Sequence, residues 1–245
     1  MKKEEIIEKL RDDANYYGEF GRQFLSNSDI RTLLRNPKEF GKPVEQTLPM
    51  LHGSYLHHKI LEPEKAAGYL IVDASTRNTK AYKEVLEESG EERLLLLKEQ
   101  ENLDKCAGAL MSNMEAYDLI RGDEVIYEEP GIKEIFGNTW KAKRDIGWPM
   151  LSPDIKSSGD ILKFKRSAWE YNYDSQAWVY QQIFGAPMVF LVVDKTTHQI
   201  GIFTCSDEFL ERGKNKVIQA TAVYDTYFGP NATKDINNYL IVEEL

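Results

Sequence analysis

The fold is decided by a stretch that reads Lys141-Ala-Lys143-Arg144-Asp145, then Asp154-Ile155-Lys156-Ser157-Ser158 and, further on, Gln176-Ala-Trp-Val-Tyr180. Successive side chains of a strand alternate between its two faces. Asp154 and Lys156 are therefore expected to point the same way, while Ile155 points into the core. The stretch predicts a strand that carries an acid and a base on one face and is followed by a helix.

A second carboxylate is expected next to this strand. Asp145 ends a β-like run that begins at Thr139, and a turn with Pro149 and Pro153 can bring it beside Asp154. Carboxylates are hard oxygen ligands suited to Mg²⁺ or Mn²⁺, and a nearby ammonium can steady an attacking hydroxide or a developing phosphorane charge. The spacing indicates metal-assisted cleavage of a phosphodiester. A solvated cross-strand charge pair is the alternative for an isolated Asp-x-Lys.

The composition is that of an ordinary globular chain, with 42% hydrophobic and 29% charged residues among 245. No apolar run approaches membrane-spanning length, so no membrane partner is expected, and the first residues lack the apolar core of a signal peptide. The two cysteines, Cys106 and Cys205, offer neither a disulfide framework nor a four-cysteine metal set. A reduced, cytoplasmic location is therefore expected.

The net charge of −9 is unusual for a DNA-binding protein. Affinity for phosphates depends on local arrangement, however, and basic residues bracket the acidic pair. They are Lys141, Lys143 and Arg144 before it, and Lys163, Lys165 and Arg166 after it. Lys143 and Arg144 are the predicted DNA contacts of this set; solvated surface is the alternative.

The chain is predicted to form a single domain over residues 1–245, with a mainly helical part (1–125) that carries His57 and a sheet core (126–245). Helices are expected at 4–24, 29–35, 53–61, 80–89, 98–120, 167–184 and 207–227. Strands are expected at 132–136, 139–146, 154–156, 188–193 and 200–205, the first two joined by a turn at Gly137-Asn138. This order implies an α/β or α+β fold with a mixed central sheet flanked by helices.

Further side chains are candidates for the site. Gln176 and Tyr180 lie four apart, so a helix places them on one face together with Tyr173, where they can contact a DNA strand; a partly buried aromatic core is the alternative. His57 can bind a metal when its imidazole is neutral, although an ordinary core-edge histidine is the competing interpretation. Glu134 is the predicted third carboxylate, and Glu128 and Glu129 are its competitors.

Five short segments match, in order along the chain, the motifs of a known protein family. Ser28–Phe40 contains Pro37-Lys-Glu-Phe40, and Gly53-Ser-Tyr-Leu-His57 is followed by Ile60-Leu-Glu-Pro63. Lys143-Arg144-Asp145, Asp154-Ile-Lys156-Ser-Ser158 and Gln176-x-x-x-Tyr180 complete the set. Over roughly residues 28–205 the chain resembles phage-type exonucleases of the RecE (exonuclease VIII) group, within the PD-(D/E)xK nuclease superfamily that includes lambda exonuclease and RecB-type nuclease domains. The resemblance implies a restriction-endonuclease-like core.

The resemblance also implies roles. Asp145 and Asp154 would hold Mg²⁺ or Mn²⁺, with the Ile155 carbonyl and His57 as further ligands. Lys156 would position or deprotonate the attacking water, and Gln176 and Tyr180 would contact DNA. RecB-type members with an iron–sulfur cluster carry a cysteine near the Pro-x-x-Phe and three late ones; here only Cys205 is late, so no cluster is expected.

The activity implied is a Mg²⁺-dependent exonuclease that digests linear duplex DNA from an end, in the 5′→3′ direction, and leaves single strands for recombination. The implied partners are double-stranded DNA ends, a single-strand annealing protein and further copies of the chain in a trimeric or tetrameric ring. The alternatives are an endonuclease or a single-strand-specific nuclease on the same core, a DNA-end-binding protein without cleavage, and an unrelated acidic helical scaffold.

Overall fold

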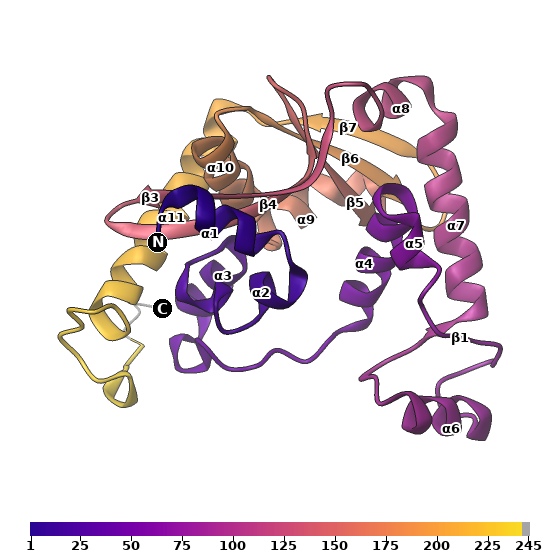
Figure 1. Ribbon diagram of the computed structural model, residues 1–245, viewed down its shortest axis with the longest axis horizontal. Coiled ribbons are helices and arrows are strands. Elements are labelled where there is room, and N and C mark those ends of the chain that lie inside the picture. Colours follow the sequence, from indigo (N-terminus) through magenta and orange to yellow (C-terminus); the bar gives the residue numbers. More distant parts are fainter. Residues whose placement is uncertain (242–245) are drawn as a thin grey trace.

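The first half of the chain is helical and the second half carries the long strands, as the sequence predicts (Figure 1). The computed structural model of the protein describes residues 1–241. The helices of the first half are α1 (Lys3–Leu10), α2 (Asp13–Tyr17), α3 (Asn27–Arg35), α4 (Leu48–Leu61), α5 (Pro63–Ala66), α6 (Lys80–Ser89), α7 (Leu97–Ser112) and α8 (Met114–Ile120). Short 3-10 turns lie at Gly21–Gln23 and Pro37–Glu39.

Helix ends differ from the predictions where capping side chains decide them. The predicted helix at 4–24 is divided, because Asp12 caps α2 through the Ala14 amide. Helix α3 begins two residues early, since Ser26 and Asp29 form a capping box. Thr47 caps α4, which therefore begins at Leu48 rather than at Gly53. The predicted helix at 98–120 is split at Asn113, whose side chain caps α8.

The strands form a mixed arrangement, which confirms the predicted fold class. They are β3 (Ile126–Ile135), β4 (Asn138–Gly147), β5 (Ser152–Ser158), β6 (Met188–Asp194) and β7 (Ile200–Thr204). β3 and β4 pair antiparallel, β5 and β6 pair parallel, and β7 runs antiparallel to β6. Two very short strands, β1 (Ile71–Val72) and β2 (Leu95–Leu96), form a separate parallel pair that two-residue patterns could not predict.

The β3–β4 hairpin turns one residue earlier than predicted. Ile135 pairs with Asn138, so the turn residues are Phe136 and Gly137, with φ angles of 50° and 79°. Two left-handed residues are what a tight two-residue hairpin requires. The position of this turn fixes which residues of β3 and β4 face each other.

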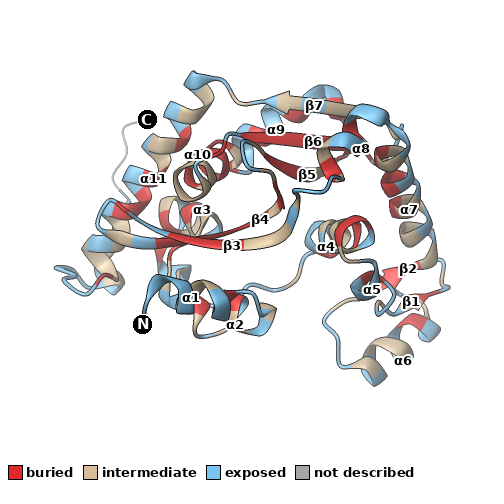
Figure 2. Cartoon of the chain, turned by 45° about the horizontal axis from the view of Figure 1, so that its top comes forward, coloured by how far each residue is buried: buried red, intermediate tan, exposed pale blue. Residues whose placement is uncertain are grey.

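The central strand β6 is buried on both faces. Leu191 and Val193 pack into a core with α4 and α7, whereas Phe190 and Val192 pack into a second core with α9 (Phe164–Glu170) and α10 (Tyr173–Phe184). A strand covered on both sides reads as a continuous apolar run, which is why 188–193 was recognisable. Figure 2 shows β5 and β6 in the buried colour between these helices.

The last helices differ in how closely they follow the prediction. The predicted helix at 167–184 is two helices, because Asn172 adopts a left-handed conformation with φ 59° between α9 and α10. Helix α11 (Asp207–Tyr227) has the predicted bounds and packs along α10. Within residues 1–241, no helix combines the length and apolarity needed to cross a membrane.

Candidate active site

Asp145 lies where the two groups of strands meet. Its carboxylate oxygen Oδ2 accepts a hydrogen bond from the Ile155 amide of β5 at 3.0 Å. The same oxygen lies 3.2 Å from Nδ1 of His57, on α4. The side chain thus joins β4, β5 and α4. The predicted turn does bring Asp145 to the Asp154 strand, and it contains Pro149, whereas Pro153 lies in β5.

His57 is held between two of the groups that the resemblance offered as metal ligands. Its Nδ1 faces Asp145, and its Nε2 lies 2.7 Å from the carbonyl oxygen of Ile155. Burial alone would lower the pKa of His57, but the neighbouring Asp145 carboxylate raises it to about 9. A protonated imidazole donates to both oxygens, so His57 carries positive charge at the position where the two oxygens converge.

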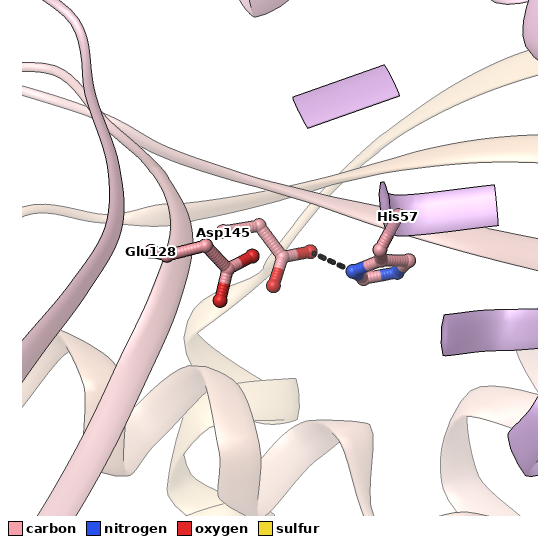
Figure 3. Close-up of side chains that lie close together, drawn as sticks. All are labelled: His57, Glu128 and Asp145. Atoms are coloured by element: carbon pink, nitrogen blue, oxygen red, sulfur yellow. Dashed lines mark ion pairs between the residues drawn. The ribbon is translucent and has the colours of Figure 1, made fainter. Parts of the chain in front are cut away.

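Glu128 is the third acid of the site. The β3–β4 pairing places Tyr127 opposite Ile146 and Glu129 opposite Arg144, so Glu128 lies across from Asp145. Ligand atoms of His57, Glu128 and Asp145 lie within 4.8 Å of one another (Figure 3). Burial, together with the charge of Asp145, raises the pKa of Glu128 to about 8. Glu128 has a φ of 49°, an uncommon conformation for a residue with a side chain.

The prediction that chose Glu134 is not supported by its position. Glu134 pairs with Thr139 near the tip of the hairpin and is exposed, far along the strand from Asp145. In an antiparallel hairpin, each step away from the turn increases the separation of the paired residues along the sequence by two. Counting back from the turn at Phe136-Gly137 leads to Glu128, which the sequence offered only as a competitor.

Asp154 and Lys156 form a second group on β5. Asp154 is 1% exposed; its Oδ1 accepts from Nε2 of Gln176 at 2.7 Å, and its Oδ2 pairs with the Lys156 ammonium. Burial raises the pKa of Asp154 to about 6. Burial also opposes charge on Lys156, but the Asp154 carboxylate outweighs it and holds the pKa of Lys156 above its usual range. Asp154 and Lys156 share one face of the strand, as predicted.

A cavity of about 510 Å³ connects the two groups. It is lined by the first group, His57, Glu128 and Asp145, and by the second group, Asp154 and Lys156, together with Gln176. Tyr180 also lines it, although its hydroxyl donates to the Lys143 carbonyl at 3.0 Å. Gln176 and Tyr180 therefore reach the site from one face of α10.

Tyr173 does not reach the cavity with them. Its ring stacks on Phe190 at 5.5 Å and tilts against Phe164 at 5.9 Å, in the core below the site. The Lys156 ammonium lies 5.1 Å from its ring centroid. Tyr173 therefore supports Lys156 from below, and the partly buried aromatic interpretation is the correct one for this residue.

The two predicted basic contacts point in different directions. Arg144 lies on the opposite face of β4 from Asp145, where it pairs with Glu129 and donates to Ser152 Oγ at 3.2 Å. Lys143 lines the cavity but is 7% exposed and pairs with Asp13 of α2. The position of Arg144 therefore does not support the predicted DNA contact, because adjacent residues of a strand face opposite ways.

The acidic groups fit a hard divalent cation. Burial raises the pKa of Glu128, repulsion from the neighbouring Asp145 carboxylate raises it further, and a cation between the two carboxylates would relieve that repulsion. Glu128 and Asp145 supply carboxylate oxygens, and Ile155 supplies a carbonyl oxygen near His57. Oxygen-rich sites of this kind suit Mg²⁺ or Mn²⁺.

β4 carries an acid near its end, and the adjacent strand β5, which belongs to the mixed sheet of β5, β6 and β7, carries an Asp-x-Lys. This combination defines the PD-(D/E)xK class of folds. The sequence profile of the family described as "PDDEXK-like domain of unknown function (DUF3799)" matches residues 24–228, and the chain belongs to this family.

Two solved structures are similar to the chain. A protein of Eubacterium rectale named as a candidate exonuclease has a TM-score of 0.60 at 17% sequence identity, over 96% of this chain and 95% of that chain. The protein SSO0001 has a TM-score of only 0.38 at 12% identity, over 93% of this chain and 87% of that chain. The first likeness supports the fold; the second is too low to support anything. No curated protein matches the chain.

Proposed function

We propose that the protein is a divalent-metal-dependent deoxyribonuclease that digests linear duplex DNA from its ends. The observation that carries the proposal is the grouping of Glu128, Asp145 and His57 beside a buried Asp154–Lys156 pair in one cavity. The candidate exonuclease of similar fold adds support for action at ends. The resemblance to the RecE group supports 5′→3′ polarity, a ring of copies, a cytoplasmic location and a single-strand annealing protein as partner.

Glu128, Asp145 and the Ile155 carbonyl would hold the cation, and Asp154 lines the same cavity. A divalent cation there supplies positive charge that polarises the scissile phosphate and makes a water molecule more acidic. His57 must lose its proton before its nitrogen can serve as a ligand. The chain's own residues then orient the phosphate beside Asp145 and Lys156.

Lys156 acts as a cation and not as a base in this proposal. Its ammonium is kept protonated by Asp154, so it has no lone pair with which to take a proton from water. It can stabilise the charge that develops on the phosphate oxygens. Gln176 and Tyr173 hold this pair in place, Gln176 through the second oxygen of Asp154 and Tyr173 through its ring.

The test compares end-labelled linear duplex with closed circular duplex, in Mg²⁺ or in EDTA. Lys156→Ala is run beside the matched control Lys163→Ala, which removes an exposed lysine outside the cavity. Mg²⁺-dependent loss of linear DNA alone, abolished only by Lys156→Ala, is the expected result, and the label position gives the polarity. Cleavage of circles would favour an endonuclease, and binding without cleavage of either would favour an end-binding protein.

A further inference from the structure

The wall of the cavity next to β4 is built by the N-terminal segment, and its residues Tyr16 and Tyr17 lie upstream of the residues that match the family. The Leu25 amide donates to the Thr139 carbonyl at 3.0 Å, and the Lys141 amide donates back to the Leu25 carbonyl at 2.7 Å. This short pairing fixes the segment to the edge of β4. Helices α1 and α2 then lie alongside β3 and β4 (Figure 2).

Two buried lysines of β4 hold α2 in place. The Lys141 ammonium donates to the Tyr16 carbonyl, and the Lys143 ammonium pairs with Asp13. Both ammonium groups also lie over the Tyr16 ring, at 4.3 and 4.6 Å from its centroid. Each lysine is 7% exposed, so the cations are used to anchor α2 rather than left free for solvent.

The residue after Tyr16, Tyr17, is exposed to solvent. Tyr17 is 65% exposed and lines the cavity that also contains Asp145 and Lys156. Its ring meets Tyr16 edge-on, with centroids 4.9 Å apart at 74°. A second open ring, Tyr171, is 52% exposed and lines the same cavity from the turn between α9 and α10.

The turn that carries Tyr171 is as firmly fixed as α2. Asn172 is buried at 9% exposure in a left-handed conformation, and its side-chain oxygen accepts from the Lys216 ammonium at 2.8 Å. Its carbonyl accepts from Ser175 Oγ at 2.9 Å. Two rigidly mounted elements therefore present exposed phenol rings to one polar cavity.

Open aromatic rings beside a phosphate site match the chemistry of an unpaired nucleic-acid strand. Bases stack on aromatic side chains with little regard for sequence, whereas in a duplex both faces of an interior base are already covered. We infer that Tyr17 and Tyr171 stack on bases of a single, unpaired DNA strand that flanks the scissile phosphate. This inference rests on the proposed nuclease function and specifies the form in which the strand enters the site.

The test uses the full chain and a single-stranded oligonucleotide of about 12 nucleotides, within the range of single-strand binding sites. One 2-aminopurine is moved along it, because stacking on tyrosine quenches this base. Binding in EDTA is measured for Tyr17→Ala, Tyr171→Ala, Tyr17→Phe and Tyr171→Phe. The matched control is Tyr117→Ala, which removes a ring of 44% exposure on α8, outside the cavity.

We expect quenching at one or two positions of the strand for the wild type, the phenylalanine variants and Tyr117→Ala. Each alanine variant at Tyr17 or Tyr171 should lose quenching at one position and bind about 5- to 100-fold more weakly. Circular dichroism melts should be unchanged, since both rings are exposed. Alanine variants that quench and bind like Tyr117→Ala, in a protein that still cleaves DNA, would overturn the inference and leave the nuclease standing. A wild type that neither binds nor cleaves any DNA would overturn both.

Discussion

Glu128 is the most strained of the acids in the site, since a left-handed backbone and a half-buried carboxylate coincide there. Its pKa of about 8 in the folded protein lies above the ordinary value of 4.5. At pH values between 4.5 and about 8, Glu128 of the folded chain binds its proton more tightly than Glu128 of the unfolded chain does. Stability contributed by Glu128 is therefore present at low pH and is lost as pH rises through this window.

The first prediction concerns Glu128→Gln in the absence of divalent metal. The variant should raise the melting temperature, and the gain should be larger near pH 9 than near pH 5, because only the charged form is penalised. Differential scanning calorimetry in EDTA measures it. Glu129→Gln, which removes the partner of Arg144, should lower the melting temperature instead. A gain that shrinks as pH rises would contradict the assignment.

The second prediction concerns Arg144. Removing it leaves Glu129 half-buried without its partner and takes a donor from Ser152. Arg144→Ala should cost about 2–4 kcal/mol of unfolding free energy, measured by urea denaturation. DNA affinity of the folded variant should equal that of the wild type. A normal stability combined with weaker DNA binding would return Arg144 to the role that the sequence first assigned to it.

At this scale the sequence was informative wherever strand alternation alone decides the answer. Asp154 and Lys156 lie on one face for that reason, and helical spacing put Gln176 and Tyr180 on one face of α10. The third acid was not predictable in this way, since it depends on the residues at the tip of the hairpin. A shift of one residue in that turn changes every pair behind it.

At the scale of elements, α10 is the helix that the site depends on most. Its partner α11 approaches so closely that a Cβ on Gly213 would lie 2.1 Å from the carbonyl oxygen of Asp174. The carboxylate of Asp174 is itself buried and paired with Arg212 and Lys216 of α11. The position of Gln176, two residues further along α10, is thus set by contact with another helix.

The third prediction tests that dependence with Gly213→Ala. The added methyl group must push the helices apart, which should cost about 1–3 kcal/mol of stability. The turnover rate of the folded fraction should fall as well, because Gln176 moves relative to Asp154. Gly108→Ala is the control: a Cβ there meets nothing within 4 Å, so it should stabilise α7 by about 0.5–1 kcal/mol. Unfolding curves and single-turnover rates measure both effects.

Element bounds could be predicted where apolar periodicity and caps agree. Helices α6 and α11 begin after Thr79 and Ser206, whose side chains accept from the first-turn amides, and both were placed correctly. The errors occurred where a polar residue within a periodic pattern turned out to be a cap, as at Asp12 and Asn113. A cap and an ordinary surface residue are identical in sequence, and tertiary packing decides between them.

At the scale of the whole molecule, the charge of −9 limits how the protein can bind DNA. The lysines that line the cavity are Lys141, Lys143 and Lys156, and each already contacts an oxygen of the protein. Few phosphates can therefore be neutralised without breaking an internal contact. Stacking and bound cations must then supply much of the affinity.

The fourth prediction is a weak dependence of DNA binding on salt. A protein that neutralises Z phosphates of duplex DNA shows a slope of about −0.9Z in a plot of log affinity against log salt. With three lysines in the cavity, the slope in EDTA should be no steeper than about −3. Anisotropy titrations of a short duplex measure it. A slope near −6 would place additional cations along the DNA, outside the cavity.

The family-matched region begins at residue 24, yet the cavity wall in front of it comes from α2. The sequence predicted Asp145, Asp154, Lys156 and the helix of the matched region, since these residues follow known motifs. The wall could not be predicted, because Tyr16 and Tyr17 carry no motif. Their placement depends on two lysines more than 120 residues away in the chain, as the Lys141–Tyr16 contact shows.

The hydrogen bond from the Ile155 amide ends on the same Asp145 oxygen that faces His57. A divalent cation bound to the Asp145 carboxylate would withdraw electron density from it. The chemical shift of the Ile155 amide proton would therefore change. In ¹⁵N-labelled protein the Ile155 resonance should shift with each addition of Mg²⁺, while the amide of Val192, buried in β6, stays in place. The Ile155 amide resonance is thus a reporter of cation binding, and occupancy of the site can be measured without any cleavage of DNA.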